Sequence, residues 1–334
     1  MRARFVTVVV VTAVVGLLSP AGPAAAGGCV YRLDTRLSAP AGFTNPVVIA
    51  GDGAAGYVGF VQARDSDAIW PVVWRNGHVR LLPVPAGVRA LAFGVNRLGD
   101  AVGMLIDGPG IYRAVLWPGG ADPIPLAPLT PGRSAAARDI NEAGQIIGDA
   151  EKPDGLSQIV TWSMTDPGTV TTVPVSPEQP QTFAGTISSE GVVLGGGFVG
   201  SVAGLHLVPS PQGVAPTAAA VAASGRFLAG SYAEVDGSLT VHALVWENEV
   251  PTVLSTADSY ATGVTATGIV SGVDVARQRA VVWRGAVMHT LPLPPAGTDR
   301  LQSDTVAIAE DGTVAGSVFF PRTGRGLLVL WHCR

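Results

Sequence analysis

The stretch Ile140-Asn141-Glu142-Ala143-Gly144-Gln145-Ile146-Ile147-Gly148 contains the pattern that decides the fold. A β-branched residue stands four positions before a glycine, and a second glycine follows four positions later. Glycine tolerates the positive φ that a tight hairpin turn requires. The stretch therefore predicts two short strands joined by a turn at Gly144.

This pattern recurs in seven units along the chain. The turn glycine of each unit is Gly53, Gly99, Gly144, Gly191, Gly225, Gly268 or Gly312. The β-branched residue before it is Ile49, Val95, Ile140, Ile187, Val221, Val264 or Ile308. The second glycine is Gly59, Gly103, Gly148, Gly195, Gly230, Gly272 or Gly316. Such self-similarity at a fixed period indicates a repeat architecture.

Tryptophan marks the same repeat. The tryptophans in register are Trp74, Trp117, Trp162, Trp246, Trp283 and Trp331. They are spaced by 43, 45, 84, 37 and 48 residues, and 84 is twice 42, so one unit lacks its tryptophan. That unit is the fourth, 181–217, which has His206 near the expected place. We expect each tryptophan to pack between neighbouring units.

Each unit of about 43 residues contains four short strand patterns, as in the second unit at 90–96, 101–106, 112–117 and 123–126. Four antiparallel strands at this spacing are typical of a propeller blade. The sequence therefore predicts an all-β fold, a seven-bladed β-propeller with four-stranded blades. The repeats cover 43–334 within a single domain of 27–334.

The two ends of the chain predict how the ring closes. The last unit ends with its third strand, and the segment 29–36 resembles the fourth strands of other units. We expect this N-terminal strand to complete the final blade. Cys29 would then lie beside Cys333, and these are the only cysteines. The sequence therefore predicts a disulfide at the seam of the ring.

Composition excludes several classes of protein. The 43 Gly and 26 Pro among 334 residues exclude a mostly helical fold. A chain with 47% hydrophobic and 14% charged residues is too apolar to be intrinsically disordered. Its net charge of −4 has scattered signs, which gives no basic surface for nucleic acid or an anionic membrane.

Residues 1–26 predict a signal peptide. Arg2 and Arg4 precede an apolar run at 5–18, and Ala24-Ala25-Ala26 fits the small residues before a cleavage site, here before Gly27. The run is too short to span a bilayer, and no later stretch is long enough. We therefore expect a secreted, extracellular protein without a membrane span. A lipoprotein box ending at Cys29, with a lipid on that residue, is the alternative.

Several segments resemble the bacterial extracellular HAF repeats. The strands Arg113–Trp117, His242–Trp246 and Arg279–Trp283 resemble the H-A-F-x-W strand of that family, and 140–148 looks like its I-N-x-x-G-x-x-x-G turn. The resemblance covers roughly residues 43 to 334. It implies an exported propeller of poorly defined role, with no established catalytic residues to carry over.

The sequence offers few candidates for metal or cofactor chemistry. No pair among the five histidines has the spacing of metal ligands, so we expect neither a metal nor a cofactor. His242 occupies a column that holds Arg113 and Arg279 in other units, which favours a structural role. Asp65-Ser66-Asp67 begins like a calcium loop, but Ile69 breaks the pattern, and a solvated loop is the better interpretation.

We place the candidate site at the mouth of the central channel, where the first strand of each blade begins. The residues in register there are Asn45, Leu91, Ala136, Phe183, Thr217, Tyr260 and Asp304, with Arg89 and Asp258 two residues earlier. We expect Asn45, Arg89, Tyr260 and Asp304 to bind a small polar ligand. Arg138 and Asp139 lie deeper, and we expect them to pair with each other.

Two functions from different classes fit these observations. The first is a monomeric binding or scaffolding module at the cell surface, whose partner is a glycan, peptide or protein. The second is an exported enzyme of the lyase or hydrolase type, built around Asp304 and Tyr260. An enzyme needs at least two titratable groups that face one cavity, and this level of the channel has few acids and no histidine. The small number of titratable groups favours a binding module over an enzyme. A purely structural role in the envelope stays open.

Overall fold

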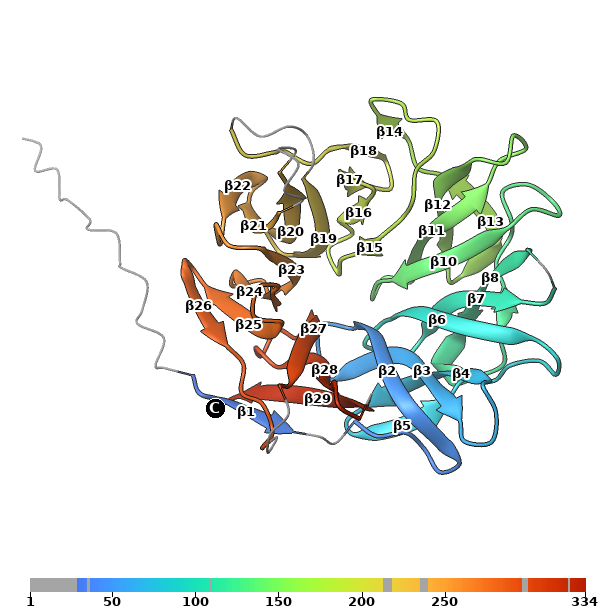
Figure 1. The fold of residues 1–334 in the computed structure, drawn as a ribbon. Coiled ribbons are helices and arrows are strands. Elements are labelled where there is room, and N and C mark those ends of the chain that lie inside the picture. The colour runs from blue at the N-terminus through green and yellow to red at the C-terminus, as the bar shows by residue number, and fades with distance from the viewer. Residues whose placement is uncertain are drawn as a thin grey trace, which may run out of the picture. The chain divides into compact units, whose positions relative to one another are not determined.

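The computed structural model describes residues 29–34, 37–108, 110–212, 218–234, 240–295, 300–323 and 325–334. The predicted signal peptide, 1–26, lies outside the described residues. All described strands belong to the compact unit Tyr31–Arg334. They form seven sheets that surround a central channel in chain order, so the predicted seven-bladed β-propeller is confirmed (Figure 1). In the part of the chain described, no helix has the length and apolarity needed to cross a membrane.

The first three blades are regular four-stranded antiparallel sheets. Blade 1 comprises β2 (Phe43–Gly51), β3 (Gly56–Ala63), β4 (Ile69–Arg75) and β5 (His78–Leu81). Blade 2 comprises β6 (Arg89–Val95), β7 (Ala101–Ile106), β8 (Tyr112–Trp117), the 3-10 helix η1 (Pro118–Gly120) and β9 (Ile124–Pro125). Blade 3 comprises β10 (Ala135–Ile140), β11 (Gln145–Glu151), β12 (Ser157–Ser163) and β13 (Asp166–Thr172).

The remaining blades repeat this arrangement. Blade 4 comprises β15 (Thr186–Ile187), β16 (Val193–Gly195), β17 (Phe198–Ser201) and β18 (Gly204–Leu207), with β14 (Val175–Ser176) added beside β18. Blade 5 comprises β19 (Ala219–Ser224), β20 (Phe227–Ala233), β21 (Val241–Glu247) and β22 (Val250–Val253). Blade 6 comprises β23 (Ser259–Val264), β24 (Ile269–Asp274), β25 (Arg279–Arg284) and β26 (Val287–Thr290). Blade 7 comprises β27 (Gln302–Ile308), β28 (Val314–Phe320), β29 (Arg325–Cys333) and β1 (Tyr31–Asp34).

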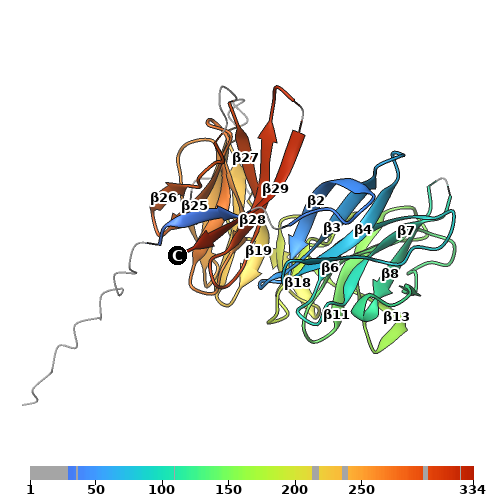
Figure 2. The ribbon, with the colours of Figure 1, turned by 90° about the horizontal axis from the view of Figure 1, so that it is seen from below.

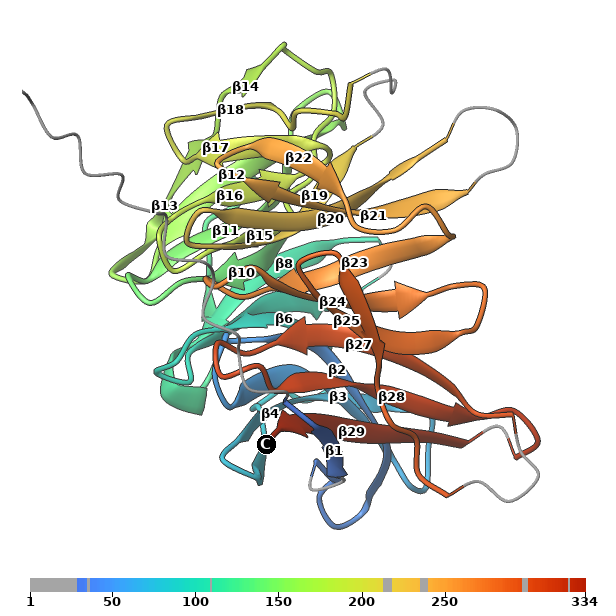
Figure 3. The same ribbon diagram turned by 90° about the vertical axis from the view of Figure 1, so that its left-hand side faces the viewer.

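The N-terminal strand closes the ring as predicted. β1 pairs antiparallel with β29, with Tyr31 opposite Cys333 (Figure 3). Blade 7 in turn packs against β2 of blade 1, so the last and first repeats meet (Figure 2). Cys29 and Cys333 are both disulfide-bonded, which confirms the predicted bridge. Because its sulfur is in the disulfide, Cys29 has no thiol left to carry a lipid.

The tryptophan column packs between blades, as predicted. Trp74, Trp117, Trp246, Trp283 and Trp331 have no exposed surface. Most of these indoles also donate a hydrogen bond to the carbonyl of the loop that precedes their blade, as Trp117 Nε1 does to Pro83 at 2.8 Å. Each indole that donates in this way links its blade to the chain that enters it. Tryptophan suits this position because its ring has a large apolar area and its indole N–H can donate one hydrogen bond.

Blade 4 lacks this tie, and the place of its missing tryptophan was predicted wrongly. Trp162 pairs with Ile146 in blade 3, and the equivalent pair in blade 4 is Gly200 with Val193. Gly200 therefore stands where the other blades have tryptophan, whereas His206 lies on the fourth strand, β18. The third strand is also short, because Gly196 and Gly197 turn the chain directly after β16. The parallel strand β14 covers the outer edge of this reduced blade.

The second glycine of each repeat is required by a close approach of the backbone. In every blade this glycine lies beneath a carbonyl oxygen of the innermost strand or, in blade 4, of the segment just before it, and a Cβ would come well within 3.0 Å of that oxygen. The clash could not be relieved by a side-chain movement, because the neighbouring atom belongs to the backbone. The residues that supply the carbonyl are Val47, Leu91, Ala136, Phe183, Ala219, Tyr260 and Asp304. These seven residues mark one level of the channel, which we call the entrance level.

Blades 1 and 5 depart from the predicted register. In the other five blades the turn glycine donates its N–H to the carbonyl three residues earlier, as Gly144 does to Asn141. Gly53 and Gly225 instead directly follow the first residue of their turns, Asp52 and Ser224. Their innermost strands are consequently displaced by two residues from the predicted alignment. The entrance level is therefore occupied by Val47 rather than Asn45, and by Ala219 rather than Thr217, which lies outside the described residues.

Candidate functional site

The innermost strands end in polar turns, and we call this the turn end of the channel. In five blades the first residue of the turn accepts a hydrogen bond from the backbone N–H four residues later, at 3.0–3.2 Å. These five residues are Asp52, Asn96, Asn141, Ser188 and Thr265. Such side chains substitute for the backbone in tight turns. The I-N-x-x-G pattern is thus explained by turn formation rather than by ligand binding.

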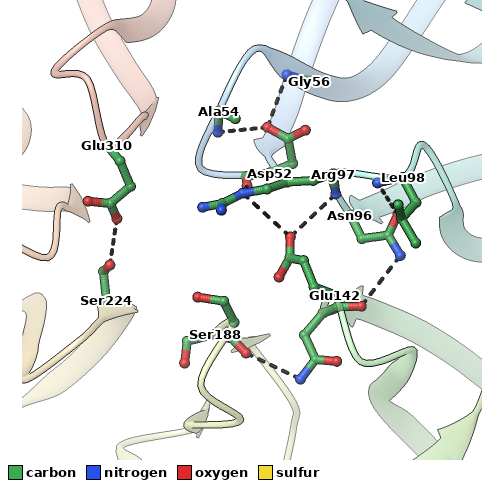
Figure 4. A network of polar contacts seen from close by, with 12 residues as sticks. Asp52, Ala54, Gly56, Asn96, Arg97, Leu98, Glu142, Ser188, Ser224 and Glu310 are labelled. Carbon is green, nitrogen blue, oxygen red and sulfur yellow. Dashed lines mark hydrogen bonds and ion pairs between the residues drawn. The ribbon is translucent and has the colours of Figure 1, made fainter.

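Contacts between different blades connect these turns into a network (Figure 4). Arg97 of blade 2 reaches the carbonyl of Asp52 in blade 1, and its N–H bonds the carboxylate of Glu142 in blade 3. On the other side of the channel, Glu310 of blade 7 accepts hydrogen bonds from Ser224 Oγ at 2.6 Å and from the N–H of Ala266 at 2.9 Å. The charged groups at the turn end are therefore engaged in holding blades together.

The channel between the two ends has a volume of about 580 Å³. Its middle is lined by one residue from each blade, which in six blades lies at the register shift of the innermost strand. These residues are Ile49, Phe93, Arg138, Gly185, Val221, Thr262 and Val306. This wall is mostly apolar, and Val221, the β-branched residue of the fifth repeat, is 49% exposed here because of the shift in blade 5.

Arg138 and Asp139, both on the channel wall, do not pair with each other, contrary to our expectation. Arg138 donates to Asp149 at 2.6 Å and lies over the ring of Phe93, 5.0 Å from its centroid. Asp139 points to the next blade, where it accepts hydrogen bonds from Thr186 Oγ1 and from the N–H of Ile187. The bulge between Ala137 and Asp139 separates their directions.

Asp139 is the most perturbed carboxyl group of the channel. Burial raises its pKa to about 6, and the hydrogen bonds from Thr186 and Ile187 oppose this rise. All of its described partners are neutral donors from the wall itself. We therefore assign Asp139 to the joint between blades 3 and 4.

A second, smaller cavity of about 250 Å³ lies at the entrance level between blades 6 and 7, and we call it the blade 6–7 cavity. Blade 6 contributes Tyr260 and Val273, which are cross-strand partners, together with Val275 and Gln278. Blade 7 contributes the residues Gln302, Ser303, Asp304, Ser317 and Phe319. Within blade 7, Asp304 pairs with Ser317 and Gln302 pairs with Phe319, which are alternate pairs of the same two strands. The cavity thus combines two aromatic rings, one carboxylate, two amides and three hydroxyl groups, one of which belongs to Tyr260.

Asp304 is held by one neighbour and keeps one oxygen available. Ser317 donates both its N–H, at 2.8 Å, and its hydroxyl, at 2.7 Å, to Oδ1 of Asp304. Among the described residues, none donates to Oδ2 or forms an ion pair with this carboxylate. Burial raises the pKa of the nearby Tyr260, and the negative charge of Asp304 raises it further. Tyr260 is therefore a neutral hydroxyl at physiological pH.

The structure brings together two of the four predicted site residues. Tyr260 and Asp304 line the blade 6–7 cavity, whereas Asn45 and Arg89 line neither cavity. Asn45 donates to Gln62 at 2.8 Å in blade 1, and Arg89 is exposed at the start of β6 in blade 2. Blade 1 separates Arg89 from the blade 6–7 cavity in the ring (Figure 1).

Five polar or aromatic lining residues were not predicted, among them Ser303 of the first strand of blade 7. Ser317 and Phe319 come from the second strand of blade 7, Gln302 from the start of its first strand, and Gln278 from the turn after β24. A signal for Ser317 was present, because the second glycine of the repeat, Gly316, immediately precedes it. The exposed position of Phe319 depends on where β28 ends, and the sequence does not mark that boundary.

Among the described residues, no group of three or more His, Cys, Asp or Glu side chains is placed to hold a metal ion. His242 is buried against the ring of Tyr232, at 5.0 Å between centroids, and its Nε2 lies 3.2 Å from Glu234. His78 and His289 lie on exposed fourth strands, at the rim of their blades. The histidines are thus dispersed over the molecule.

Comparisons with known proteins find no matching family model and no matching curated protein. The HAF-repeat resemblance therefore stays a prediction. Solved structures are similar at low identity. A catalytically inactive virginiamycin B lyase from Staphylococcus aureus, solved with quinupristin, is 12% identical with a TM-score of 0.49, over 91% of this chain and 99% of that one.

Two further structures show similar values. A puromycin-hydrolysing peptidase from Mycobacterium tuberculosis is 14% identical with a TM-score of 0.49, over 86% of this chain and 55% of that one. A gluconolactonase from Xanthomonas campestris is 12% identical with a TM-score of 0.41, over 91% and 90%. None of these similarities transfers a substrate or a reaction to this chain.

Proposed function

We propose that the protein is an exported binding module whose ligand places a polar group in the blade 6–7 cavity. The observation that supports this most directly is that Tyr260 and Asp304, from different blades, line one cavity together with exposed aromatic surface. Tyr260 and Phe319 are 37% and 39% exposed, respectively. Aromatic surface next to a few oriented polar groups is the usual composition of a binding site.

The chemistry of the cavity favours binding over catalysis. Its described lining contains one carboxylate and no His, Lys or Arg. A catalytic acid or base needs a pKa close to the operating pH. The pKa of Tyr260 is instead moved upward, away from neutrality. An exported lyase or hydrolase built on Tyr260 and Asp304 is therefore the less favoured proposal.

A thermal-shift screen of the purified protein against glycans, cell-wall fragments and peptides tests this site. A ligand present at 100 times its Kd stabilises the folded state by about 2.7 kcal/mol, which raises the melting temperature measurably. We expect Tyr260→Ala and Asp304→Ala to abolish that shift. Asn45→Ala and Arg89→Ala are matched controls, because the sequence predicts both residues at the site but neither lines the cavity. Both variants should retain the thermal shift. A shift that survives in Asp304→Ala but disappears in Arg89→Ala would place the site elsewhere.

The same screen separates binding from turnover. Each compound that shifts the melting temperature is incubated with the protein and examined by mass spectrometry. A binding module returns the compound unchanged, whereas an enzyme of the alternative type produces a new mass that depends on Asp304. The second outcome would overturn the proposed binding role.

Export is the other part of the proposal. The apolar N-terminal run and the disulfide between Cys29 and Cys333 support it, because disulfides persist mainly outside the cytoplasm. N-terminal sequencing of the protein recovered from culture medium should begin at Gly27. A protein that stays inside the cell with Met1 intact would contradict export.

A further inference from the structure

We infer that the polar group held in the blade 6–7 cavity is the ammonium end of a lysine side chain, presented by a basic peptide segment. This inference rests on the proposed function and adds the charge and shape of the ligand. It follows from three properties of the cavity, which are its unbalanced charge, its apolar lining and the hydrogen bonding of Asp304.

The charge of the cavity is unbalanced. Asp304 is the only carboxylate in the described lining, and no described basic side chain pairs with it. Arg89, which the sequence predicts at this site, lies two blades away in the ring. The whole chain also has a net charge of −4, which attracts a positively charged partner from a distance. A cation is therefore the complementary ligand group.

The apolar part of the lining favours a cation on a long aliphatic stem. Val273, Val275, Tyr260 and Phe319 supply this part. Lysine and arginine bury their methylene chains on such surface while the charged end reaches a polar group. The aromatic rings of Tyr260 and Phe319 also attract a cation that approaches their faces. A volume of about 250 Å³ suits a single side chain rather than a folded segment.

The hydrogen bonds of Asp304 favour lysine over arginine. Ser317 supplies two donors to Oδ1. Oδ2 is the oxygen left for a ligand. Arginine gains its advantage from a fork that binds both oxygens of a carboxylate, whereas the ammonium of lysine is a compact charge that needs one. The cavity therefore gives arginine no bidentate partner.

Three peptides test the inference on the full protein. The probes are N-acetylated, C-amidated Gly-Lys-Gly, Gly-Arg-Gly and Gly-norleucine-Gly, and their Kd values are measured by NMR titration at low salt. An exposed ion pair together with a cation–π contact predicts that the lysine peptide binds about fivefold more tightly than the norleucine peptide. The arginine peptide should bind no more tightly than the lysine peptide. Asp304→Asn should remove the preference for lysine over norleucine.

Two variants sharpen the test. Ser317→Ala removes the hydroxyl donor to Oδ1 and opens that oxygen, so the affinity of the arginine peptide should rise relative to the lysine peptide. Asp122→Asn neutralises an exposed carboxylate of blade 2 and is the matched control for general charge effects. It should leave the ratio of the three Kd values unchanged.

The outcomes separate this inference from the function on which it rests. Equal affinity for lysine and norleucine would overturn the inference, as would tenfold tighter binding of arginine. D-glucosamine serves as a fourth probe, and tighter binding of this amino sugar than of the lysine peptide would overturn the peptide source. If the thermal-shift screen yields a ligand that depends on Tyr260 while all peptides fail, the proposed function stands and the lysine inference falls. If no ligand depends on Tyr260 or Asp304, both fall.

Discussion

At the turn end of the channel, five of the seven blades place a side-chain oxygen on the same backbone N–H, four residues along the turn. At the entrance level of the same strands, by contrast, the side chains include Val47, Leu91, Phe183, Tyr260 and Asp304. The strands are the same, and the requirements on their two ends differ. Repeated chemistry at one end forms the scaffold, and varied chemistry at the other is available for binding a ligand.

The largest expected effect comes from the glycine beneath the entrance level. A Cβ on Gly272 would collide with the carbonyl oxygen of Tyr260 and lie 2.6 Å from Cζ3 of Trp283. Neither neighbour moves freely, because one is backbone and the other a buried indole. We therefore expect Gly272→Ala to lower the free energy of unfolding by at least about 3 kcal/mol, as overpacking does at its upper range.

Urea denaturation measures this change, and Gly326→Ala is the matched control. Gly326 also lies in a strand of the ring, but a Cβ there meets no atom within 4 Å. Its substitution should change stability by less than about 0.5 kcal/mol. A Gly272→Ala protein as stable as the Gly326→Ala protein would show that the entrance level is not fixed by the backbone beneath it.

The next effect belongs to the turn end. Asn141 is buried, accepts hydrogen bonds from Ala143 and Gln145, and donates to the carbonyl of Ser188 in the next blade. Asn141→Ala removes the acceptor of the Ala143 and Gln145 N–H groups and the bond to the next blade, and it should cost about 2 kcal/mol of stability. Chemical denaturation checks the cost. The Kd for any ligand of the blade 6–7 cavity should stay unchanged in the folded variant, and a change in Kd would contradict the separation of scaffold and site.

The third prediction concerns pH and the joint between blades 3 and 4. In the unfolded chain the pKa of an Asp lies near 3.9, whereas Asp139 in the folded protein has a pKa of about 6. The folded state therefore holds a proton that the unfolded state has released between these values. Stability should rise by about 1 kcal/mol as pH falls from 7 to 5, on account of this group.

Asp139→Asn isolates that contribution. The variant cannot titrate, so the difference in unfolding free energy between the wild-type protein and the variant should move in favour of the wild type at pH 5. Asp149, whose pKa is also raised by burial, titrates in both proteins and cancels. A difference that is the same at pH 5 and pH 7 would mean that the Asp139 carboxyl is ionised throughout this range.

The sequence predicted the fold because a repeat multiplies weak signals. Glycine and tryptophan columns identified the blades, and the unmatched strands at the two ends predicted the closure and the disulfide. The predicted alignment of the innermost strands was wrong in blades 1 and 5 for a physical reason. Gly53 and Gly225 are the second residues of turns that begin at Asp52 and Ser224, whereas the turn glycine of the other blades is the fourth residue, so counting back from the glycine placed the entrance level two residues too early.

The candidate site was predicted only as far as that register holds. Tyr260 and Asp304 belong to blades 6 and 7, whose turns are regular, and both were placed at the entrance. Asn45 belongs to blade 1 and was displaced by its turn. Gln278 and Phe319 were missed because their approach to Asp304 depends on the packing of two blades, which no pattern along the chain records.

The smallest expected effect is at the entrance level of blade 4. Phe183 is 48% exposed and lines neither cavity, so Phe183→Ala should change the free energy of unfolding by less than about 0.5 kcal/mol. Ser188, at the turn end of the same innermost segment, accepts hydrogen bonds from Glu190 and Val192. Ser188→Ala should therefore cost more, about 1 kcal/mol. Denaturation of the two variants side by side compares the ends within one blade, and a larger loss at Phe183 would reverse the assignment of scaffold and variable surface.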